Sequence, residues 1–392
     1  MVQPDQIQSD DVDGQRSNAL EVQNLTKVYD DGTVAVDDIN FQVREGEFCV
    51  LIGPSGCGKS TTLHSIVGKV EPTDGHIVMD GADVTNVPTE RRDIGLVFQD
   101  FQLFPHMSVE ENVRYGLERT GTPDEEIRSR VDEMLELLRL EDIRDRSPGD
   151  LSSGQQQRVA LARSLVLEPS LLLLDEPLGD LDYKLQKSME REFLRIHREL
   201  DTTFVYVTHD QTQAMRLGDR IVVMNDGQIE QTGSVDDVYN EPATAFVATF
   251  VGDTNVFYGT VSSVDGPTAT VETEYGPLVA STPTTDGQSE DLLGTEVVLA
   301  IRPQLIDLTT DTPNTLECAV EDVIQRPGRG TQVLLTLERE SGATTELQLK
   351  TDERVDVPAE TAPIGWEPAD SRLLETVSVV EDVDLENDIL GE

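Results

Sequence analysis

A glycine-rich run near the start of the chain has residue types and spacing suited to holding phosphate groups. Its sequence is Gly53-Pro54-Ser55-Gly56-Cys57-Gly58-Lys59-Ser60, followed by Thr61. An apolar segment, 48–52, precedes it, and a segment with the residue spacing of a helix, 60–67, follows. Glycines let backbone N–H groups turn toward phosphates, and the helix N-terminus adds its positive dipole end. We expect Lys59 to reach the β and γ phosphates of ATP and Ser60 to ligate Mg²⁺. The alternative is a purely structural glycine loop, and Cys57 is interpreted as inert filler.

Two adjacent carboxylates follow a second apolar run, 171–174. Asp175 and Glu176 then stand at the end of a buried strand, where sheets of this kind bind their ligands. We expect Asp175 to hold Mg²⁺, directly or through water, and Glu176 to polarise the attacking water. The alternative is that these carboxylates cap the next helix, which becomes secondary once a phosphate loop is present.

Three further polar residues are candidates because of where they fall. Gln99 follows a strand-like segment, 94–98, from which it could reach Mg²⁺ or the attacking water. His209 comes just after the apolar segment 204–207 and could hydrogen-bond the γ phosphate. Tyr29 precedes the glycine run by one hairpin and could stack on adenine. Taken singly, each has a structural alternative: a solvated glutamine, a structural histidine and a core aromatic.

A second glycine-containing loop lies upstream of the carboxylates. It reads Leu151-Ser152-Ser153-Gly154-Gln155 and opens a predicted helix after Gly154. A helix N-terminus presents a positive dipole end to an anion. The sequence therefore indicates a protein that closes on ATP from two sides.

The elements that position these residues alternate between strands and helices. Antiparallel strands are predicted at 22–29 and 34–43, helices at 124–140 and 183–200, a buried strand at 204–207, and a hairpin with strands 221–224 and 228–231 around Asn225-Asp226-Gly227. This alternation predicts a mainly parallel sheet covered on both faces.

The character of the sequence changes near Val251. Short β-prone runs, at 256–264, 297–301, 317–324 and 332–337, are then separated by Gly, Pro, Asp and Thr turns, which is typical of a small all-β domain. We expect a disordered acidic tail at 1–18, a nucleotide-binding domain at 19–251, a β-barrel domain at 252–380 and a second acidic tail at 381–392.

The charge balance excludes several classes of partner. The net charge is −46, from 76 acidic and 30 basic residues, which argues against general binding to nucleic acid or anionic lipid. Surface carboxylates repel one another over about 8 Å at physiological salt but only about 3 Å at 1 M. We hypothesise a protein of a salt-in halophile; the alternative is an ordinary acidic protein.

Cysteine usage and hydropathy point to a soluble, cytoplasmic protein. The three cysteines, Cys49, Cys57 and Cys318, have neither disulfide-framework nor zinc-ligand spacing. No stretch has the length and apolar content of a membrane span, and the acidic N-terminus is unlike a secretory signal.

Taken together, the ordered motifs over about residues 20–250 resemble the nucleotide-binding subunit of an ABC transporter. The resemblance rests on Tyr29, the phosphate loop, Gln99, the runs 151–158 and 171–177, Asp182 and His209. It implies an α/β P-loop NTPase (ABC ATPase) domain with a mainly parallel sheet, a helical subdomain and an antiparallel β subdomain.

The resemblance also implies a head-to-tail dimer of ATPase subunits. Ser152, Gly154 and Gln155 would contact the γ phosphate held by the partner's phosphate loop, and Asp182 would join the ATP site. Two departures stand out: Ser153 occupies a position that is usually glycine, and Asp180 one that is often small.

The C-terminal region narrows the resemblance to importer ATPases. Arg302-Pro303 is similar to the Arg-Pro-Glu element of an OB-like (TOBE-type) barrel appended to these ATPases, although Gln304 stands where Glu is usual. The segments 181–185, 203–210, 221–224 and 227–231 are most similar to spermidine/putrescine importer ATPases. Importers of iron(III), sulfate/molybdate or sugars remain alternatives, followed by a non-transport ABC ATPase or a phosphate-loop kinase.

Partners and location follow from the same resemblance. It implies two membrane permease subunits, a solute-binding receptor, and a homodimer or heterodimer of ATPase subunits at the cytoplasmic face of the membrane, without nucleic acid. Phe101, Phe104 and Pro105 would form part of a groove for a short permease helix; the alternative is that these side chains belong to the core.

Overall fold

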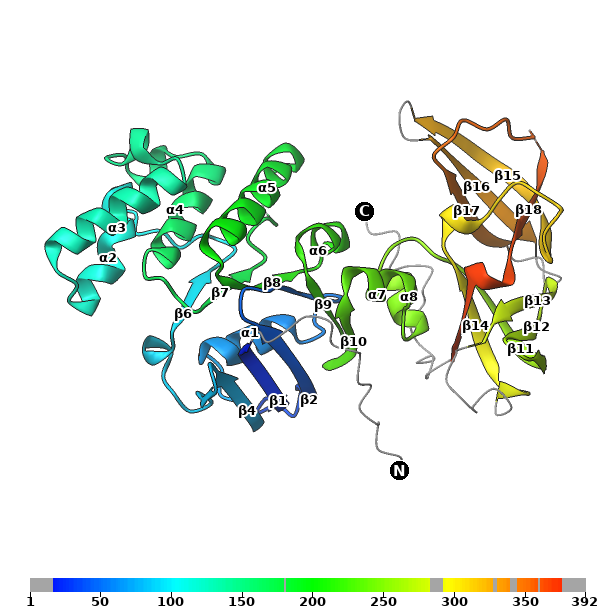
Figure 1. Cartoon of the computed structure of the whole chain (residues 1–392), viewed down its shortest axis with the longest axis horizontal. Coiled ribbons are helices and arrows are strands. Elements are labelled where there is room, and N and C mark those ends of the chain that lie inside the picture. Colours follow the sequence, from blue (N-terminus) through cyan, green and yellow to red (C-terminus); the bar gives the residue numbers. More distant parts are fainter. Residues whose placement is uncertain are drawn as a thin grey trace. The chain divides into compact units, whose positions relative to one another are not determined.

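A computed structural model describes the chain over residues 17–179, 181–282, 292–326, 330–338, 344–358 and 360–375. The chain divides into two compact units, Met1–Val235 and Asp236–Glu392 (Figure 1). The predicted domain boundary after Val251 falls later than this division. Residues 1–16 and 376–392, with most of the predicted tails, lie outside the described residues, and Asn18 already begins the first strand.

The first unit is built on a six-stranded sheet in the order β10-β9-β3-β8-β7-β6. Its strands are β3 (Phe48–Ile52), β6 (Ile94–Val97), β7 (Leu171–Asp175), β8 (Thr203–Thr208), β9 (Arg220–Asn225) and β10 (Gln228–Ser234). All neighbours pair in parallel except β9 and β10, which form the predicted antiparallel hairpin. The mainly parallel sheet is therefore confirmed.

A smaller antiparallel sheet covers part of one face. Its order is β2-β1-β4-β5, from β1 (Asn18–Val28), β2 (Val34–Arg44), β4 (Asp74–Met79) and β5 (Ala82–Asp83). The helix α1 (Lys59–Val67) lies in the same layer, because Leu63 and Ile66 share one buried cluster with Leu20, Leu51 and Val205. Alternate residues of the parallel strands thus face this layer, as a two-residue period requires.

The opposite face of the parallel sheet packs against α5 (Tyr183–Leu200) and α6 (Gln211–Leu217). Phe193 of α5 contacts the Tyr206 ring edge-on, with ring centroids 6.2 Å apart, and His197 contacts Phe48 at 5.3 Å. The prediction that both faces are covered is confirmed.

A group of helices is inserted between β6 and β7. It consists of α2 (Val109–Thr120), α3 (Asp124–Leu137) and α4 (Ser153–Leu165). The helix predicted at 124–140 ends three residues early, because Arg139 takes a positive φ of 56° that a right-handed helix cannot include. The helices α2 and α6 were not predicted.

The second unit contains two short helices and two β layers. The helices are α7 (Val235–Asn240), which starts at the last residue of the first unit, and α8 (Ala245–Phe250). A closed barrel has the order β11-β12-β13-β19-β14, from β11 (Asn255–Asp265), β12 (Thr268–Thr273), β13 (Gly276–Ser281), β14 (Glu296–Ile301) and β19 (Ser371–Glu375). The predicted all-β barrel domain is confirmed.

A four-stranded sheet completes this unit in the order β17-β16-β15-β18. Its strands are β15 (Asn314–Arg326), β16 (Gly330–Glu338), β17 (Thr344–Thr351) and β18 (Thr361–Trp366). Phe257 of the barrel stacks on Trp366 of this sheet, with ring centroids 5.6 Å apart. One hydrophobic core therefore serves both layers.

Arg302 fastens the two short helices to the barrel. Its guanidinium donates to the carbonyl oxygens of Tyr239 (2.6 Å) and Ala248 (2.9 Å), near the ends of α7 and α8, and lies 4.2 Å from the Tyr239 ring centroid. A cation at a helix C-terminus satisfies free carbonyls and the negative dipole end together. The predicted Arg302-Pro303 element therefore has a structural task, and Gln304 adds a bond to the Tyr239 hydroxyl (2.8 Å).

Candidate ATP site

The glycine run forms a tight loop between β3 and α1. A Cβ on Gly53 would come within 2.2 Å of the Met224 carbonyl oxygen, and one on Gly58 within 2.4 Å of the Ala35 carbonyl oxygen. Gly58 also has a φ of 101° and caps the N-terminus of α1. These close approaches require glycine and aim the first N–H groups of α1 at the space above the loop.

Lys59 is folded inside this loop. Its side chain is buried, and Nζ donates to the carbonyl oxygens of Gly53 and Pro54, each at 2.7 Å. These carbonyl groups belong to the loop itself, and the predicted contact of Lys59 with phosphates stays a prediction. Burial raises the pKa of the neighbouring Cys57 thiol, although Lys59 opposes the effect. Cys57 is therefore a neutral thiol, which agrees with the prediction that it is chemically inert.

Tyr29 lies against the start of α1. Its hydroxyl is 3.4 Å from Thr61 Oγ1, and its ring, which lies beside Lys27 Nζ at 5.3 Å, is 40% exposed. The core alternative is therefore wrong for Tyr29. An exposed ring beside the phosphate loop is placed to stack on a base.

Asp175 ends β7 on the side of α1. Its Oδ2 lies 3.7 Å from Nε2 of His64, which was not singled out from the sequence. Burial raises the pKa of the Asp175 carboxyl, and burial lowers that of His64. Ser60 precedes His64 by one helical turn and so shares its face of α1. A hydroxyl and a carboxylate are hard oxygen ligands that suit Mg²⁺.

Glu176 and His209 form a pair at the ends of neighbouring strands. His209 Nδ1 lies 3.1 Å from Glu176 Oε2, and the Glu176 N–H donates to the Val207 carbonyl oxygen at 3.0 Å. Glu176 has a φ of 43°, an uncommon value that turns its side chain out of the strand direction. Neither carboxylate after β7 caps α5; that N-cap is Asp182.

A buried glutamine holds the turn that carries His209. Gln213 Oε1 accepts from the Tyr206 hydroxyl (2.6 Å) and from Thr208 Oγ1 (3.2 Å), and Thr208 Oγ1 accepts from the Asp210 N–H (3.0 Å). Sequence reasoning missed Gln213. A lone glutamine four residues after a candidate histidine carries no signal until the helix α6 is placed.

Gln99 reaches the loop after Glu176. A Cβ on Gly179 would be 3.5 Å from Gln99 Nε2, so the exposed Gln99 side chain extends along this loop. Gln99 therefore lies next to the segment that follows the proposed base.

The second glycine-containing loop begins α4. Ser152 is the N-cap: its Oγ accepts from the Gln155 N–H (3.4 Å), and the Gln155 side chain accepts from the Ser152 N–H (2.9 Å). A Cβ on Gly154 would lie 2.7 Å from Leu185 Cδ1 of α5, so α4 and α5 pack closely here and a larger residue would displace the Leu185 side chain. The spacing of Ser152 and Gln155 is a capping-box pattern, a signal that could have predicted the helix start.

Asp182 plays the same part for α5. Its Oδ1 accepts from the Leu185 N–H at 3.0 Å. Its carboxylate is therefore a helix cap, and its predicted contact with ATP stays a prediction.

The aromatic segment after Gln99 is held to the helical group. Arg163 donates to the carbonyl oxygens of Phe101 (3.0 Å) and Gln102 (2.7 Å), and its guanidinium lies 5.2 Å from the Phe104 ring. Phe101 is buried, so the core alternative holds for it, whereas Pro105 is exposed and Phe104 half-buried.

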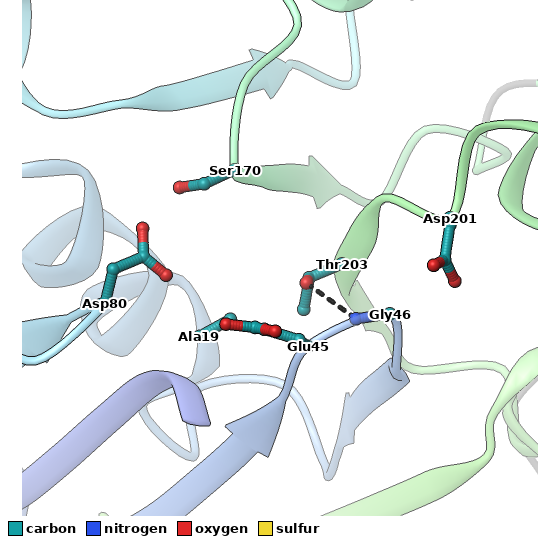
Figure 2. Close-up of a pocket in the computed structure, with 7 residues that line it drawn as sticks. All are labelled: Ala19, Glu45, Gly46, Asp80, Ser170, Asp201 and Thr203. Carbon is teal, nitrogen blue, oxygen red and sulfur yellow. Dashed lines mark hydrogen bonds between the residues drawn. The ribbon is translucent and has the colours of Figure 1, made fainter. Parts of the chain in front are cut away.

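A cavity of about 420 Å³ lies at the amino ends of the parallel strands, away from the phosphate loop (Figure 2). Gly46 precedes β3, Ser170 precedes β7 and Thr203 begins β8, so the cavity is at the amino ends of these strands. Its carboxylates, on Glu45, Asp80 and Asp201, do not suit an anionic ligand. Ligands of such sheets bind at the opposite, carboxyl ends of the strands, where the phosphate loop, Asp175 and Glu176 lie.

Comparison with known proteins agrees with this geometry. Residues 36–179 match the family model described as ABC transporter. The spermidine/putrescine import ATP-binding protein of Thermobifida fusca is 46% identical over 345 residues, covering 86% of this chain and 85% of the relative. The chain belongs to the ABC transporter family. The relative of the same name from Rubrobacter xylanophilus is 42% identical and covers 90% of this chain and 92% of its own length. Both matches extend beyond the first unit, so these two relatives also resemble part of the second unit.

Solved structures of the family resemble about half of the chain. One is cbiO1 from Clostridium perfringens, part of an ABC transporter complex, with a TM-score of 0.53 and 34% identity, covering 57% of this chain and 91% of that one. Another is the ATP-binding cassette MJ0796 in a dimeric post-hydrolysis state bound to ADP and Pi, with a TM-score of 0.50 and 34% identity, covering 55% and 98%. The ABC ATPase fold is therefore confirmed.

ATP-binding import proteins of this family hydrolyse ATP to energise solute transport. Among the described residues, no helix is long and apolar enough to cross a membrane.

Proposed function

We propose that this chain is the ATP-hydrolysing subunit of a spermidine/putrescine importer. The observation that carries the proposal is the 46% identity to an import ATP-binding protein of that name, which spans 86% of the chain, both units included. Importers of iron(III), sulfate/molybdate or sugars are the second candidate class, since the ATP site itself carries no information about the solute.

The phosphate loop binds the nucleotide. N–H groups at the start of α1 and the Lys59 ammonium bind the β and γ phosphates, while Tyr29 stacks on the adenine. When bound, Mg²⁺ would be held by Ser60, Asp175 and Gln99, and would neutralise charge on the phosphates.

Glu176 activates the water that attacks the γ phosphorus. The water oxygen forms a bond to phosphorus while the bond from phosphorus to the bridging oxygen of ADP breaks, and Glu176 accepts the proton of the water. His209, 3.1 Å from Glu176, orients that carboxylate and contacts the γ phosphate. The products are ADP and inorganic phosphate.

Two subunits complete each site. The Ser152-capped start of α4 presents a positive dipole end, and it would contact the γ phosphate bound by a partner subunit. The dimeric state of MJ0796 supports this arrangement. The exposed Pro105 and half-buried Phe104 would then contact a short helix of each permease subunit, a solute-binding receptor would deliver the solute, and the ATPase subunits would sit at the cytoplasmic face of the membrane.

Mixed subunits test the shared site. Ser152→Arg subunits mixed with Lys59→Ala subunits form dimers with one intact composite site, since one subunit supplies the phosphate loop and the other supplies Ser152. We expect each variant alone to be inactive and the mixture to regain ATPase activity. A mixture that forms dimers yet stays inactive would refute the shared-site arrangement.

Uptake measurements test the solute. The assembled transporter in vesicles is expected to accumulate labelled spermidine or putrescine in an ATP-dependent way. ATP-dependent uptake of iron(III), sulfate, molybdate or a sugar without polyamine uptake would favour the alternative.

A further inference from the structure

Two glutamine side chains hold the backbone immediately after Glu176. Gln157 of α4 donates from Nε2 to the Pro177 carbonyl oxygen at 3.0 Å, and Gln186 of α5 donates from Nε2 to the Leu178 carbonyl oxygen at 3.0 Å. Two successive carbonyl groups are thus each bound by a different helix. Glu176 itself has a positive φ, so its side-chain direction depends on how the next peptide groups are held.

The Gln157 bond is not explained by stability. Gln157 is fully buried, and its Oε1 has no hydrogen-bond partner among the residues that the structure describes. An unpartnered buried acceptor destabilises a fold, and an apolar side chain in that place would remove this cost while leaving the Pro177 carbonyl oxygen without its donor, so the amide brings little net stability. The amide at this position therefore serves a purpose other than packing.

Gln157 also lies on the helix that begins with the second glycine-containing loop. Ser152 caps α4, and Gly154 packs so closely against Leu185 of α5 that a Cβ would lie 2.7 Å from Leu185 Cδ1. Gln186 is the next residue after Leu185. The starts of α4 and α5, neighbours beside β7 (Figure 1), therefore hold the segment after Glu176 from two sides.

We infer that Gln157 and Gln186 are positioning residues for ATP hydrolysis, which fix the backbone after Glu176 and connect it to the start of α4. The inference rests on the proposed function, in which the start of α4 contacts the ATP of the partner subunit. Movement of α4 onto that ATP then passes through Gln157 to the Glu176 of the same subunit. Each subunit thereby connects one composite site to the other.

A matched pair of variants tests the positioning role. Gln157→Met keeps the chain length and removes the donor. Gln156→Met is the control, because Gln156 donates to another proline carbonyl, that of Pro148, at 2.8 Å, away from Glu176. We expect Gln157→Met to lower kcat of the ATPase about tenfold with an unchanged KM for ATP, because Glu176 is then held less well in the transition state, at a cost of the order of one buried hydrogen bond. The melting temperature should change by a similar amount in both variants, since each leaves one proline carbonyl oxygen without its side-chain donor.

The control variant should keep kcat within about twofold of the wild type. Equal kcat values for the two variants, with the wild type active, would overturn the inference without touching the proposed function. An inactive wild type would instead contradict the proposed function. If Gln157→Met does not fold, Gln186→Met is the second test variant, because Gln186 is half-buried on α5 and its replacement removes the hydrogen bond to the Leu178 carbonyl oxygen. A normal kcat in Gln186→Met would count against the inference.

Mixed dimers separate an effect on Glu176 from an effect on the glycine-containing loop. In the pair of Ser152→Arg and Lys59→Ala subunits, the Ser152→Arg subunit supplies the working Glu176. Adding Gln157→Met to that subunit should lower turnover, whereas adding it to the Lys59→Ala subunit should not. The reverse pattern would show that Gln157 acts through the loop and would overturn the inference.

Discussion

The His209 imidazole lies 3.1 Å from the Glu176 carboxylate, and the two residues follow neighbouring parallel strands, β8 and β7. The Glu176 N–H bonds the Val207 carbonyl oxygen, so the backbone register of the two strands sets the distance between the side chains. Each group restrains the other's rotamer. A base oriented in this way needs no rearrangement when water is activated.

Replacing the proposed base should abolish turnover but not binding. Glu176→Gln keeps the shape of the side chain and removes the proton acceptor, so we expect kcat to fall by roughly 10²–10⁴. ATP affinity should be retained, because the phosphate loop and Asp175 are untouched, and the closed dimer should accumulate. Single-turnover kinetics and size-exclusion chromatography with ATP measure both effects.

The matching control changes the phosphate loop instead. Lys59→Ala should weaken nucleotide binding itself, as measured by titration, while Lys350→Ala in the second unit should leave binding unchanged. ATPase activity of Glu176→Gln equal to that of the wild type would refute the role of Glu176.

Salt should stabilise this protein. With a net charge of −46, carboxylates repel one another in the folded state, and the range of that repulsion falls from about 8 Å at physiological ionic strength to about 3 Å at 1 M. We expect the melting temperature to rise by several degrees between dilute buffer and molar KCl. Sucrose at equal osmolality should not reproduce the whole rise. A melting temperature that is flat or falling in KCl contradicts the proposed adaptation to concentrated salt.

Arg302 should be important for the stability of the second unit. In Arg302→Met the carbonyl groups of Tyr239 and Ala248 lose their buried donor, which destabilises by roughly 2–4 kcal/mol. The expected signature is a lower-temperature unfolding transition of the second unit in calorimetry. Arg372→Met is the control, because Arg372 is half-exposed and its bridge to Glu241 is at the surface. Equal thermograms for the two variants would contradict the capping role.

Asp175 should reduce stability at neutral pH in the absence of Mg²⁺. Burial raises its pKa in the folded protein above the unfolded value of 3.8, so the folded chain binds the proton more tightly. Below pH 3.8 the carboxyl is protonated in both states; as pH rises through the folded pKa, the stability that the protonated form contributes is lost. Asp175→Asn, measured in EDTA, should therefore melt at a higher temperature than the wild type at pH 7, with the difference shrinking toward pH 3. A difference independent of pH would contradict this assignment.

Much of the architecture followed from local patterns. The apolar runs of β3, β7 and β8 and the long amphipathic α5 were predicted within a residue. The hairpin around Asp226-Gly227 was predicted as well, although β10 continues three residues beyond the predicted 228–231, to Ser234. These elements were predictable because side-chain period and turn chemistry are local properties. The helix α6 was missed because it is short and its buried face is defined only by the sheet beneath it.

For the candidate site, residue types and spacing were enough to propose which groups carry the chemistry: the phosphate loop, Asp175, Glu176 and His209. Only the tertiary structure decided that His209 contacts Glu176, that His64 faces Asp175, and that Gln157 and Gln186 hold the backbone after Glu176. The physical reason is that a glycine-rich loop or a carboxylate at a strand end can be recognised from neighbouring residues in the sequence. A hydrogen bond between residues far apart in the sequence depends instead on the register of the strands and the packing of the helices. Such partners become visible only when the fold brings them together.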